Sequence, residues 1–512
     1  MPQETVSAIP SPRSSVGVSR VQWLVVGATL LACAAVVARL PLWGTTAWGI
    51  HEVPNLAGNL PLLVVMGLLF GAYIFWERSA QSAETGKRTS HAGKIAVFCA
   101  LALGLGLGAR LGESAGWGRL AILTINPASG GFFEAAYDSQ HDPNWLQNYP
   151  KLMKEYHHVH SHPPMGVALM RWWLGQRSPA LTGATDNFLA ISPGTNSTAL
   201  AQFTAGAWKR PYTANDIAAA FWGGMMWLLC ALLVPACSYV SANALFGSRA
   251  ALQSASLACV VPSLLMFVPG ADQSYVSCAA LALALAITGY KRFEATPAIG
   301  ATLLALGGIA AALGVTGSFA GAWAILLTST FLALRGGSPF KTRVTQVVIY
   351  MGAGLLTLVV LRFMGMDWLT FWRSLIAYNV DANVNPILRF VYHLADFFTF
   401  FGVPISIILF WGMFRSWRSG RQSLAEESDE TQVASRNILA LALPTLTVLL
   451  LLNIVISMAE TARIWMLFMP PLLVAVGGIL SRSQAPALPR WVLAAQLIQT
   501  WVFVVFLNVW SL

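Results

Sequence analysis

Residues 215–241 read NDIAAAFWGGMMWLLCALLVPACSYVS, and Asp216 is the only charged side chain among them. A helix of about 20 predominantly apolar residues is long enough to cross the hydrocarbon core of a bilayer. Stretches of this kind recur between residues 21 and 510. Because a helix satisfies its backbone hydrogen bonds within one segment, these stretches predict a bundle of transmembrane helices.

The composition of the whole chain supports the membrane class. Of its 512 residues, 56% are hydrophobic and 10% are charged, whereas a typical soluble protein has about 25% charged residues. So few charges cannot cover the surface of a soluble protein. The net charge is +10, but no block of Lys and Arg residues occurs. We therefore expect no nucleic acid partner.

We predict an all-α polytopic membrane protein with about thirteen transmembrane helices and further helices at the outer membrane face. The expected spans are residues 21–43, 59–77, 95–112, 215–241, 250–268, 274–290, 297–315, 318–334, 344–362, 399–414, 437–457, 464–480 and 492–510.

The basic residues predict which segments face the cytoplasm, because positively charged loops stay on that side. With the N-terminus inside, more than half of the Lys and Arg residues lie in the short cytoplasmic segments 1–20, 78–94, 242–249, 291–296, 335–343, 415–436 and 481–491. The outer side then includes the long segments 113–214 and 363–398, and as a whole it carries 13 of the 21 acidic residues and every histidine except His91. We expect the chemistry on this outer side.

The outer segment richest in candidate catalytic side chains is residues 131–174, GFFEAAYDSQHDPNWLQNYPKLMKEYHHVHSHPPMGVALMRWWL. Glu134 and Asp138 are four residues apart, so on a helix they share one face. Such a pair suits a general base with a metal ligand, or a base with a hydrogen-bond partner. The alternative is an ordinary solvated loop.

The sequence after this pair predicts one surface helix and one loop. Asp142 suits an N-cap, with Pro143 at the first position of a helix over 142–158 that Pro150 kinks. Residues 178–214 are rich in Ser, Thr, Asn, Gly and Pro, which predicts a loop.

Four histidines, His157, His158, His160 and His162, follow on the same segment. The HExxH pattern and nearby cysteine ligands are missing, so a divalent metal is only the second interpretation and we assign no metal ligand. We favour histidines that bind a phosphate or a sugar hydroxyl, with His160 as a substrate-site candidate. Pro163 and Pro164 fix the chain after His162 and aim its side chain toward a cavity.

Two further outer positions carry ionisable side chains at the ends of spans. Asp272 lies in VPGADQSYV, where it is either a functional residue or a helix N-cap. Glu460 and Arg463 are three residues apart in SMAETARIWMLFMPPLL, so they could pair on a helix. We favour instead a phosphate-binding role for Arg463.

These motifs, in this order, resemble the polyprenyl-phosphate-sugar-dependent glycosyltransferases of the GT-C superfamily, especially the protein O-mannosyltransferase and lipid A aminoarabinose transferase group. The residues that carry the resemblance are Phe133-Glu134-Ala135-Ala136-Tyr137, His162-Pro163-Pro164-Met165-Gly166, Asp272, and Arg463 through Pro470-Pro471. The resemblance covers residues 95–512 and implies a GT-C-like catalytic body there. Residues 1–94 are then an N-terminal tail and an added two-span hairpin. The acid is Glu where the family usually has Asp, and His162 replaces its lysine; Glu52 is the fallback acid.

The resemblance implies direct displacement at the outer face of a bacterial plasma (inner) membrane. Glu134, or Asp138, would deprotonate an acceptor hydroxyl, while Arg463 and His162 stabilise the leaving lipid phosphate. Asp272 and Glu460 are candidates for the same site. The partners would be a lipid-linked sugar donor, membrane lipid, and an acceptor that is a glycan, a lipid or a protein.

Two other functions compete with this interpretation. A transporter or flippase of a lipid-linked glycan would place ionisable groups near the membrane centre, in two related halves. A lipid-glycan polymerase or ligase would have its large outer loop late in the chain. Here the polar residues gather on one side, no repeat is visible, and the largest outer segment is early. These features favour the glycosyltransferase.

Overall fold

The computed structural model describes residues 13–38, 49–50, 55–81, 90–126, 131–156, 159, 162–192, 195–378, 386–422, 429–455, 463 and 465–508. In these ranges the chain is almost entirely helical, which confirms the all-α class. The exception is a short antiparallel pair, β1 (Gly49–Ile50) and β2 (Leu507–Asn508), in which Gly49 lies opposite Asn508.

The helices fall into three groups along the chain. The N-terminal group is α1 (Arg13–Val37), α2 (Leu60–Gln81) and α3 (His91–Leu111). A group of short helices follows: η2 (Gly116–Gly118), α4 (Arg119–Ile125), α5 (Phe132–Asp138), α6 (Tyr149–Glu155), α7 (Met165–Gly175), α8 (Pro179–Leu189) and α9 (Ser197–Trp208). The remainder is α10 (Ala214–Ala231), α11 (Leu233–Phe246), α12 (Ser248–Cys259), α13 (Pro262–Met266), α14 (Asp272–Phe293), α15 (Pro297–Gly317), η4 (Phe319–Gly321), α16 (Ala322–Leu334), α17 (Phe340–Phe363), α18 (Trp368–Tyr378), α19 (Pro386–Phe401), α20 (Val403–Gln422), α21 (Asp429–Val455), η5 (Trp465–Phe468), α23 (Met469–Ser481) and α24 (Leu488–Phe506).

Within the described residues, nine helical segments are long and apolar enough to cross a membrane, and they coincide with nine of the predicted spans. These segments are Arg20–Val37, Leu60–Ser79, His91–Leu111, Ala214–Phe246, Asp272–Phe293, Pro297–Gly317, Phe340–Phe363, Glu430–Leu452 and Leu488–Phe506. The chain is an integral membrane protein with many helices, as the sequence predicts.

The other four predicted spans are shorter or broken, so the count of thirteen is not confirmed. Predicted span 250–268 is divided into α12 and α13, where Pro262 starts the second helix. Spans 318–334 and 464–480 fall on the shorter apolar segments Phe319–Leu334 and Trp465–Ser481. Span 399–414 crosses the junction of α19 and α20, which meet at 103°. The apolar pattern of the sequence gives the length of an apolar segment. Whether the helix is interrupted inside that segment depends on the local backbone geometry.

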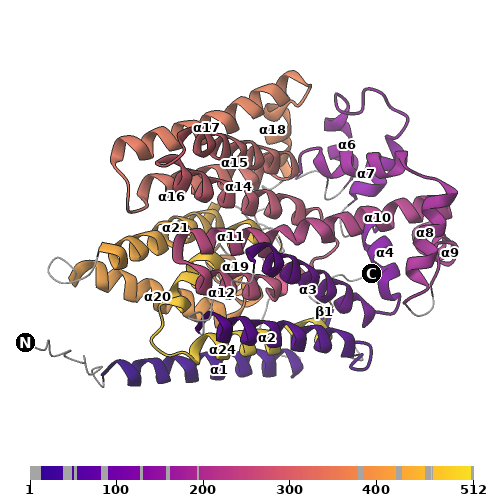
Figure 1. Ribbon diagram of the computed structural model, residues 1–512. Coiled ribbons are helices and arrows are strands. Elements are labelled where there is room, and N and C mark those ends of the chain that lie inside the picture. Colours follow the sequence, from indigo (N-terminus) through magenta and orange to yellow (C-terminus); the bar gives the residue numbers. More distant parts are fainter. Residues whose placement is uncertain are drawn as a thin grey trace, which may run out of the picture.

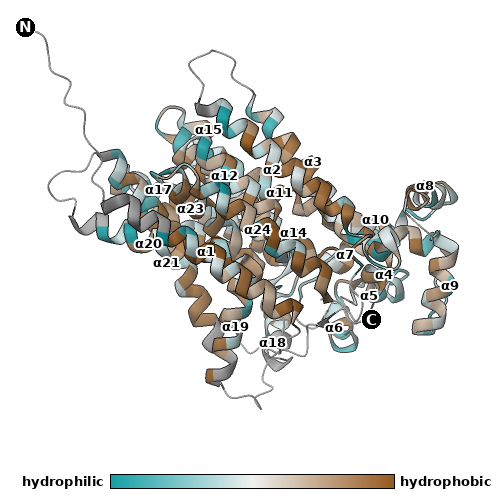
Figure 2. Cartoon of the chain, turned by 90° about the horizontal axis from the view of Figure 1, so that it is seen from below, coloured by the Kyte–Doolittle hydropathy of each residue, from teal (hydrophilic) through white to brown (hydrophobic). Residues whose placement is uncertain are grey.

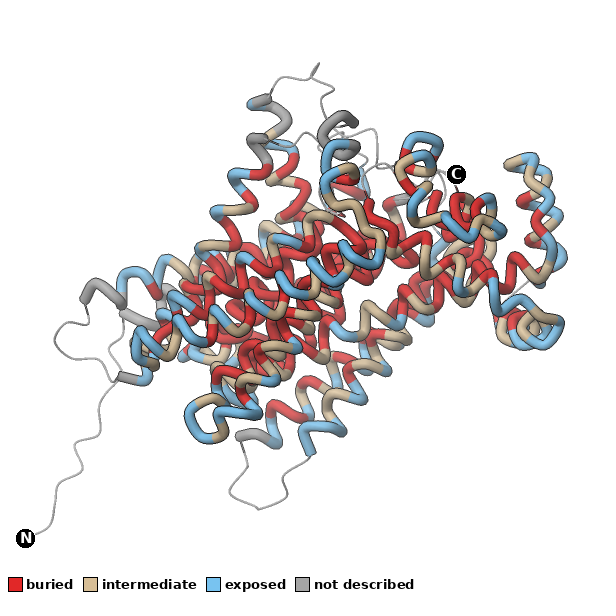
Figure 3. The backbone as a smooth tube through the Cα atoms, turned by 90° about the horizontal axis from the view of Figure 1, so that it is seen from above, coloured by how far each residue is buried: buried red, intermediate tan, exposed pale blue. Residues whose placement is uncertain are grey.

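Helix α14 forms the centre of the bundle, and α17 lies at its edge. In their spans, 78% of the residues of α14 are buried but only 17% of those of α17, and Figure 3 shows the buried core surrounded by exposed helix faces. Helix α15 packs between the two. At Gly308 of α15 a Cβ atom would lie 2.1 Å from the carbonyl oxygen of Tyr350 in α17. Small residues allow this close approach of membrane helices.

The N-terminal helices are part of the same bundle. Helix α1 packs along α24 and α20, and α2 packs against α3, α12 and α24 (Figure 1). Large apolar side chains such as Trp23, Leu31 and Phe75 are exposed on the outside, and Figure 2 shows hydrophobic residues along the long helices. Exposed apolar side chains on a membrane protein face lipid. The division at residue 94 stays a prediction.

The helices from α4 to α9 gather at one end of the bundle, beside α10 (Figure 1). Helices α8 and α9 show that the predicted loop 178–214 is wrong over much of its length. Its polar residues act as helix caps: the Ser178 hydroxyl accepts a hydrogen bond from Leu181 N, and the Asn196 side chain accepts one from Ala199 N. Side chains of this kind favour helix starts as much as loops.

The predicted helix 142–158 is also wrong in its start. Helix α6 begins at Tyr149, and Pro150 occupies its first turn without a kink. A proline is tolerated there because the first helical N–H groups have no intrahelical acceptor. Asp142 closes a turn instead, accepting hydrogen bonds from Asn144 N and from the Asn148 side chain, each at 2.8 Å.

Candidate active site

Helix α5 holds the acidic pair that the sequence points to. It begins after Gly131, whose φ of +65° is a left-handed conformation that favours glycine. The first-turn residue Phe133 and its neighbours Ala135 and Ala136 are fully buried. This burial turns the opposite face of α5 outward, and Glu134 and Asp138 both lie on it. Their side chains are 13% and 34% exposed.

One guanidinium group bridges the two carboxylates. Arg210 Nη2 lies 2.5 Å from Glu134 Oε1, and Arg210 Nη1 donates to Asp138 Oδ1 and Oδ2 at 2.8 and 2.9 Å. Two carboxylates one helical turn apart repel each other unless a cation lies between them. Arg210 supplies that cation from the segment between α9 and α10.

Two tyrosines complete this cluster. The Tyr156 hydroxyl donates a hydrogen bond to Asp138, and burial followed by that contact raises the pKa of Tyr156. The Tyr212 ring packs edge-on against Phe133 and Tyr137, with centroids 5.7 and 5.1 Å apart. Asp138 therefore contacts both Arg210 and Tyr156. The contact described for the Glu134 carboxylate is the ion pair with Arg210.

The electrostatics distinguish Glu134 as the group suited to accept a proton. Burial raises the pKa of Glu134, the Arg210 guanidinium opposes this, and the nearby Asp138 carboxylate raises the pKa further. The net direction is upward. A carboxylate with a raised pKa is a stronger base in its ionised form.

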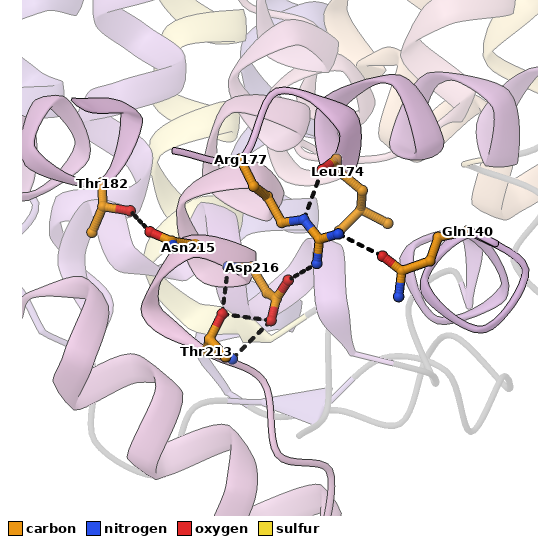
Figure 4. A network of polar contacts seen from close by, with 7 residues as sticks. All are labelled: Gln140, Leu174, Arg177, Thr182, Thr213, Asn215 and Asp216. Atoms are coloured by element: carbon orange, nitrogen blue, oxygen red, sulfur yellow. Dashed lines mark hydrogen bonds and ion pairs between the residues drawn. The ribbon is translucent and has the colours of Figure 1, made fainter. Parts of the chain in front are cut away.

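A second polar network fixes the segment that carries Arg210 (Figure 4). Thr213 and Asp216 form a capping box at the start of α10, and the buried Asp216 carboxylate also pairs with Arg177 Nη1 at 2.6 Å. Arg177 donates in addition to Leu174 O and to Gln140 Oε1. This network ties the end of α7 and the turn after α5 to the start of α10. It holds the chain three residues beyond Arg210.

The backbone before Arg210 is unusual as well. Lys209 has a φ of +55°, the left-handed region that a residue with a Cβ rarely adopts. Among the described residues, Lys209 is the only one other than glycine that has a positive φ. Backbone strain of this kind persists where the surroundings over-determine the conformation, often at functional sites.

His162 connects the acidic helix to α14. Its Nδ1 lies 3.0 Å from Gly317 O, and since a carbonyl oxygen only accepts, Nδ1 carries the proton. Its carbonyl accepts a hydrogen bond from the Tyr149 hydroxyl at 3.0 Å. The imidazole lies between the rings of Phe132 and Tyr275, with centroids 5.3 and 6.5 Å away.

The Tyr275 hydroxyl continues this connection to a buried ion pair. It donates to Asp272 Oδ1 at 2.6 Å, and Asp272 Oδ2 lies 3.3 Å from Arg463 Nε. Both members of the pair are about 95% buried. Asp272 belongs to the first turn of α14 while Ala271 is the N-cap, so the N-cap interpretation of Asp272 is wrong.

The structure thus links three of the sequence-predicted residues in one line of contacts, in which His162 leads through Tyr275 to Asp272 and Arg463. Glu134 is not part of this line, although Phe132, two residues before it on α5, contacts His162. His160 and Glu460, together with His157, His158 and Glu52, lie outside the described residues.

Arg210 was not predicted as a site residue. Its contacts join positions 72 and 76 residues apart in the chain, which no local spacing reveals. The usable signal is the Thr213–Asp216 capping box, which marks the start of the next helix just after Arg210.

A metal ion has no ready site among the described side chains, since no three His, Cys, Asp or Glu groups there come together. The position between Glu134 and Asp138 that would suit a bridging cation is taken by the Arg210 guanidinium. The charge that a metal would bring to these carboxylates comes from the protein itself.

No protein-family model and no curated protein sequence matches the chain. Among solved structures, it is similar to the oligosaccharyltransferase of Archaeoglobus fulgidus in its apo form, with 13% identity and a TM-score of 0.43 over 76% of this chain and 50% of that one. The archaeal oligosaccharyltransferase AglB from Archaeoglobus fulgidus, in complex with an inhibitory peptide and a dolichol-phosphate, matches with 12% identity and a TM-score of 0.44, over 77% of this chain and 51% of that one.

The chain therefore spans about half the length of these solved structures. Both neighbours are oligosaccharyltransferases.

Proposed function

We propose that the chain is a membrane glycosyltransferase that moves a sugar from a polyprenyl-phosphate donor to an acceptor hydroxyl at the outer membrane face. The observation that carries the proposal is the pair of carboxylates on α5, bridged by Arg210 at the end of an apolar helix bundle. Carboxylates in such a setting are costly to desolvate and mark function. The apolar body would hold the lipid tail of the donor.

In this reaction Glu134 is the base. The acceptor oxygen forms a bond to the anomeric carbon, and its proton passes to the Glu134 carboxylate. The bond from the anomeric carbon to the phosphate oxygen breaks, and that oxygen keeps the electron pair. Asp138 is the positioning residue, because Arg210 and Tyr156 both hold it, and through Arg210 it orients Glu134.

The departing phosphate gains negative charge and needs cations or hydrogen-bond donors. Arg463 and His162 are the proposed groups. Arg463 carries the charge but is neutralised in part by Asp272. A phosphate would therefore bind to the Asp272–Arg463 pair as a unit, with the ion pair fixing the guanidinium before the donor arrives.

The test is a transfer assay with the purified full chain in lipid, a panel of radiolabelled polyprenyl-phosphate monosaccharides, and envelope membranes as the source of acceptor. We expect Glu134→Gln to reduce turnover by about 10²–10⁴-fold while donor binding survives, because the amide cannot accept the proton. Glu155→Gln is the matched control: the same chemical change at an exposed position of α6.

The outcomes separate this function from its competitors. Transfer that survives Glu134→Gln at the wild-type rate refutes the proposed base. If label crosses the bilayer without any transfer, the protein is a flippase. If an assembled lipid-linked glycan is used and the monosaccharide donors are not, the chain is a polymerase or ligase.

A further inference from the structure

A cavity of about 690 Å³ lies at the end of the bundle opposite the candidate active site. It is an open cavity lined by the second half of α20, the first turns of α21 and the end of α23. In Figure 1 the C-terminal end of α20 and the N-terminal end of α21 point to the left, and α6 and α7 lie at the right. The proposed sugar transfer uses no residue of this cavity.

The cavity wall carries a concentrated positive charge. Arg415 and Arg418 come from α20 and Arg482 follows α23, whereas no acidic side chain belongs to the described lining. Ser416, Ser435 and Ser483 add hydroxyl groups. A concave site lined by one sign of charge, with hydrogen-bond donors, favours an anion.

The arginines are held at the wall by neighbouring groups. Arg482 donates from Nη1 to Ser435 Oγ and from Nη2 to Thr431 O, both at 3.1 Å, so its guanidinium is fixed against α21. The guanidinium carbons of Arg415 and Arg418 lie 5.0 and 5.1 Å from the ring centroids of Trp411 and Phe414. Stacking of this kind keeps a cation at an aromatic face without neutralising its charge.

The remaining wall is apolar and lies where membrane segments end. Trp411, Phe414, Ile438 and Ile479 line the cavity beside the arginines, and the Phe414 side chain is 52% exposed. The apolar stretch of α21 starts at Glu430, at the same end of the bundle. Charged groups therefore meet apolar surface where a candidate membrane span ends.

We propose that this cavity binds the phosphate of an anionic phospholipid from the leaflet opposite the candidate active site. The three arginines contact the phosphate, and the apolar wall receives the glycerol end of the acyl chains. Basic pockets between membrane helices recognise anionic head groups in this way. A free phosphate shares the head group chemistry but gains nothing from the apolar wall.

The experiment is native mass spectrometry of the full chain in detergent, titrated with phosphatidylglycerol or with phosphatidylcholine, which has no net charge. Phosphatidylglycerol should bind preferentially, and Arg415→Gln with Arg418→Gln should weaken it by about 30-fold, at roughly a factor of five for each charge. The charge-retaining pair Arg415→Lys with Arg418→Lys should keep most of the preference and shows whether the glutamine pair merely misfolds.

The matched control is Arg292→Gln with Lys341→Gln, two exposed cations at the same end of the bundle but outside the cavity lining. If this control loses the preference to the same extent, general surface charge binds the lipid and the site is refuted. If inorganic phosphate at about a hundredfold excess over the lipid displaces it, the occupant is a soluble anion and the lipid assignment is wrong. Equal binding of both lipids also overturns the proposal.

Discussion

Arg210 contacts both carboxylates of α5 through one guanidinium, so a single residue sets the charge balance of the candidate base. The Arg210 charge lowers the pKa of Glu134 against the upward effect of burial and of Asp138. Without Arg210, both remaining influences act in the same direction. The protonation of Glu134 is therefore the property most sensitive to this residue.

We predict that Arg210→Gln shifts the acid limb of the pH–rate profile to higher pH. A base works only when it is deprotonated, so activity rises as the pH passes its pKa, and a higher pKa moves that rise upward. At neutral pH the turnover should fall by about 10- to 100-fold, the equivalent of a charged hydrogen bond of ~1.5–3 kcal/mol. Arg210→Lys keeps the charge and should shift the limb less.

The control for this prediction is Lys209→Gln. It removes the positive charge of an exposed side chain that directly precedes Arg210 in the chain. It should leave the acid limb in place. An unchanged acid limb in Arg210→Gln, with active protein, would show that another group titrates and that Glu134 is not the base.

The acidic half of the site could be predicted, and its basic half could not. Glu134 and Asp138 are four residues apart, and helical periodicity alone puts them on one face. The partner Arg210 reaches them only because the network around Asp216 and Arg177 folds the α9–α10 segment against α5. Contacts over 72 residues depend on the packing of several helices, which a single sequence does not specify.

At the scale of elements, the apolar pattern predicts where a membrane span lies, but it does not predict where a helix is interrupted. The junction of α19 and α20 illustrates the difference. Gly402 has a φ of +119°, and a Cβ atom there would lie 2.1 Å from Gln496 Oε1. A left-handed glycine ends a helix, and Pro404 cannot continue the old one. These two residues were a readable stop signal inside the apolar run 399–414.

The Asp272–Arg463 pair joins α14 to the segment just before η5, two parts far apart in the chain, and it is buried on both sides. We predict that Arg463→Ala destabilises the protein by about 3–5 kcal/mol, because it leaves the Asp272 carboxylate buried without its cation. Thermal unfolding in detergent measures this loss. The single variant therefore cannot by itself show that Arg463 binds phosphate.

The double variant Asp272→Asn with Arg463→Met separates the two roles. The amide oxygen that Asp272→Asn introduces still accepts the hydrogen bond of the Tyr275 hydroxyl, no charge is left buried, and most of the stability should return. If Arg463 holds the donor phosphate, the KM for the lipid-phosphate donor stays high in the stable double variant. Recovery of both stability and donor KM would leave Arg463 with a structural role alone.

At the scale of the whole molecule, the two ends of the bundle have opposite chemistry. One end carries the carboxylates of α5 with the helices α4 to α9 around them (Figure 1). The other end carries Arg415, Arg418 and Arg482 around the cavity. These arginines belong to the segments that the positive-inside pattern assigns to the cytoplasm. The orientation of the chain thus decides both proposals, since each depends on which leaflet and which compartment its site faces.

We predict that a cysteine at Gln202, exposed on α9, reacts with a membrane-impermeant thiol reagent in intact cells, and that one at Ala295, exposed in the segment after α14, reacts only after permeabilisation. Long segments with few net positive charges are translocated, whereas short basic ones are retained. The native cysteines form a low background, because Cys33, Cys237 and Cys259 are buried and the other three are partly buried. The parent chain measured alongside gives this background directly. Labelling at Ala295 but not at Gln202 in intact cells would place α5 in the cytoplasm. A base that faces the cytoplasm could not serve an acceptor at the outer face, so that single result would remove the proposed reaction and leave the α5 carboxylates to be explained by cytoplasmic chemistry.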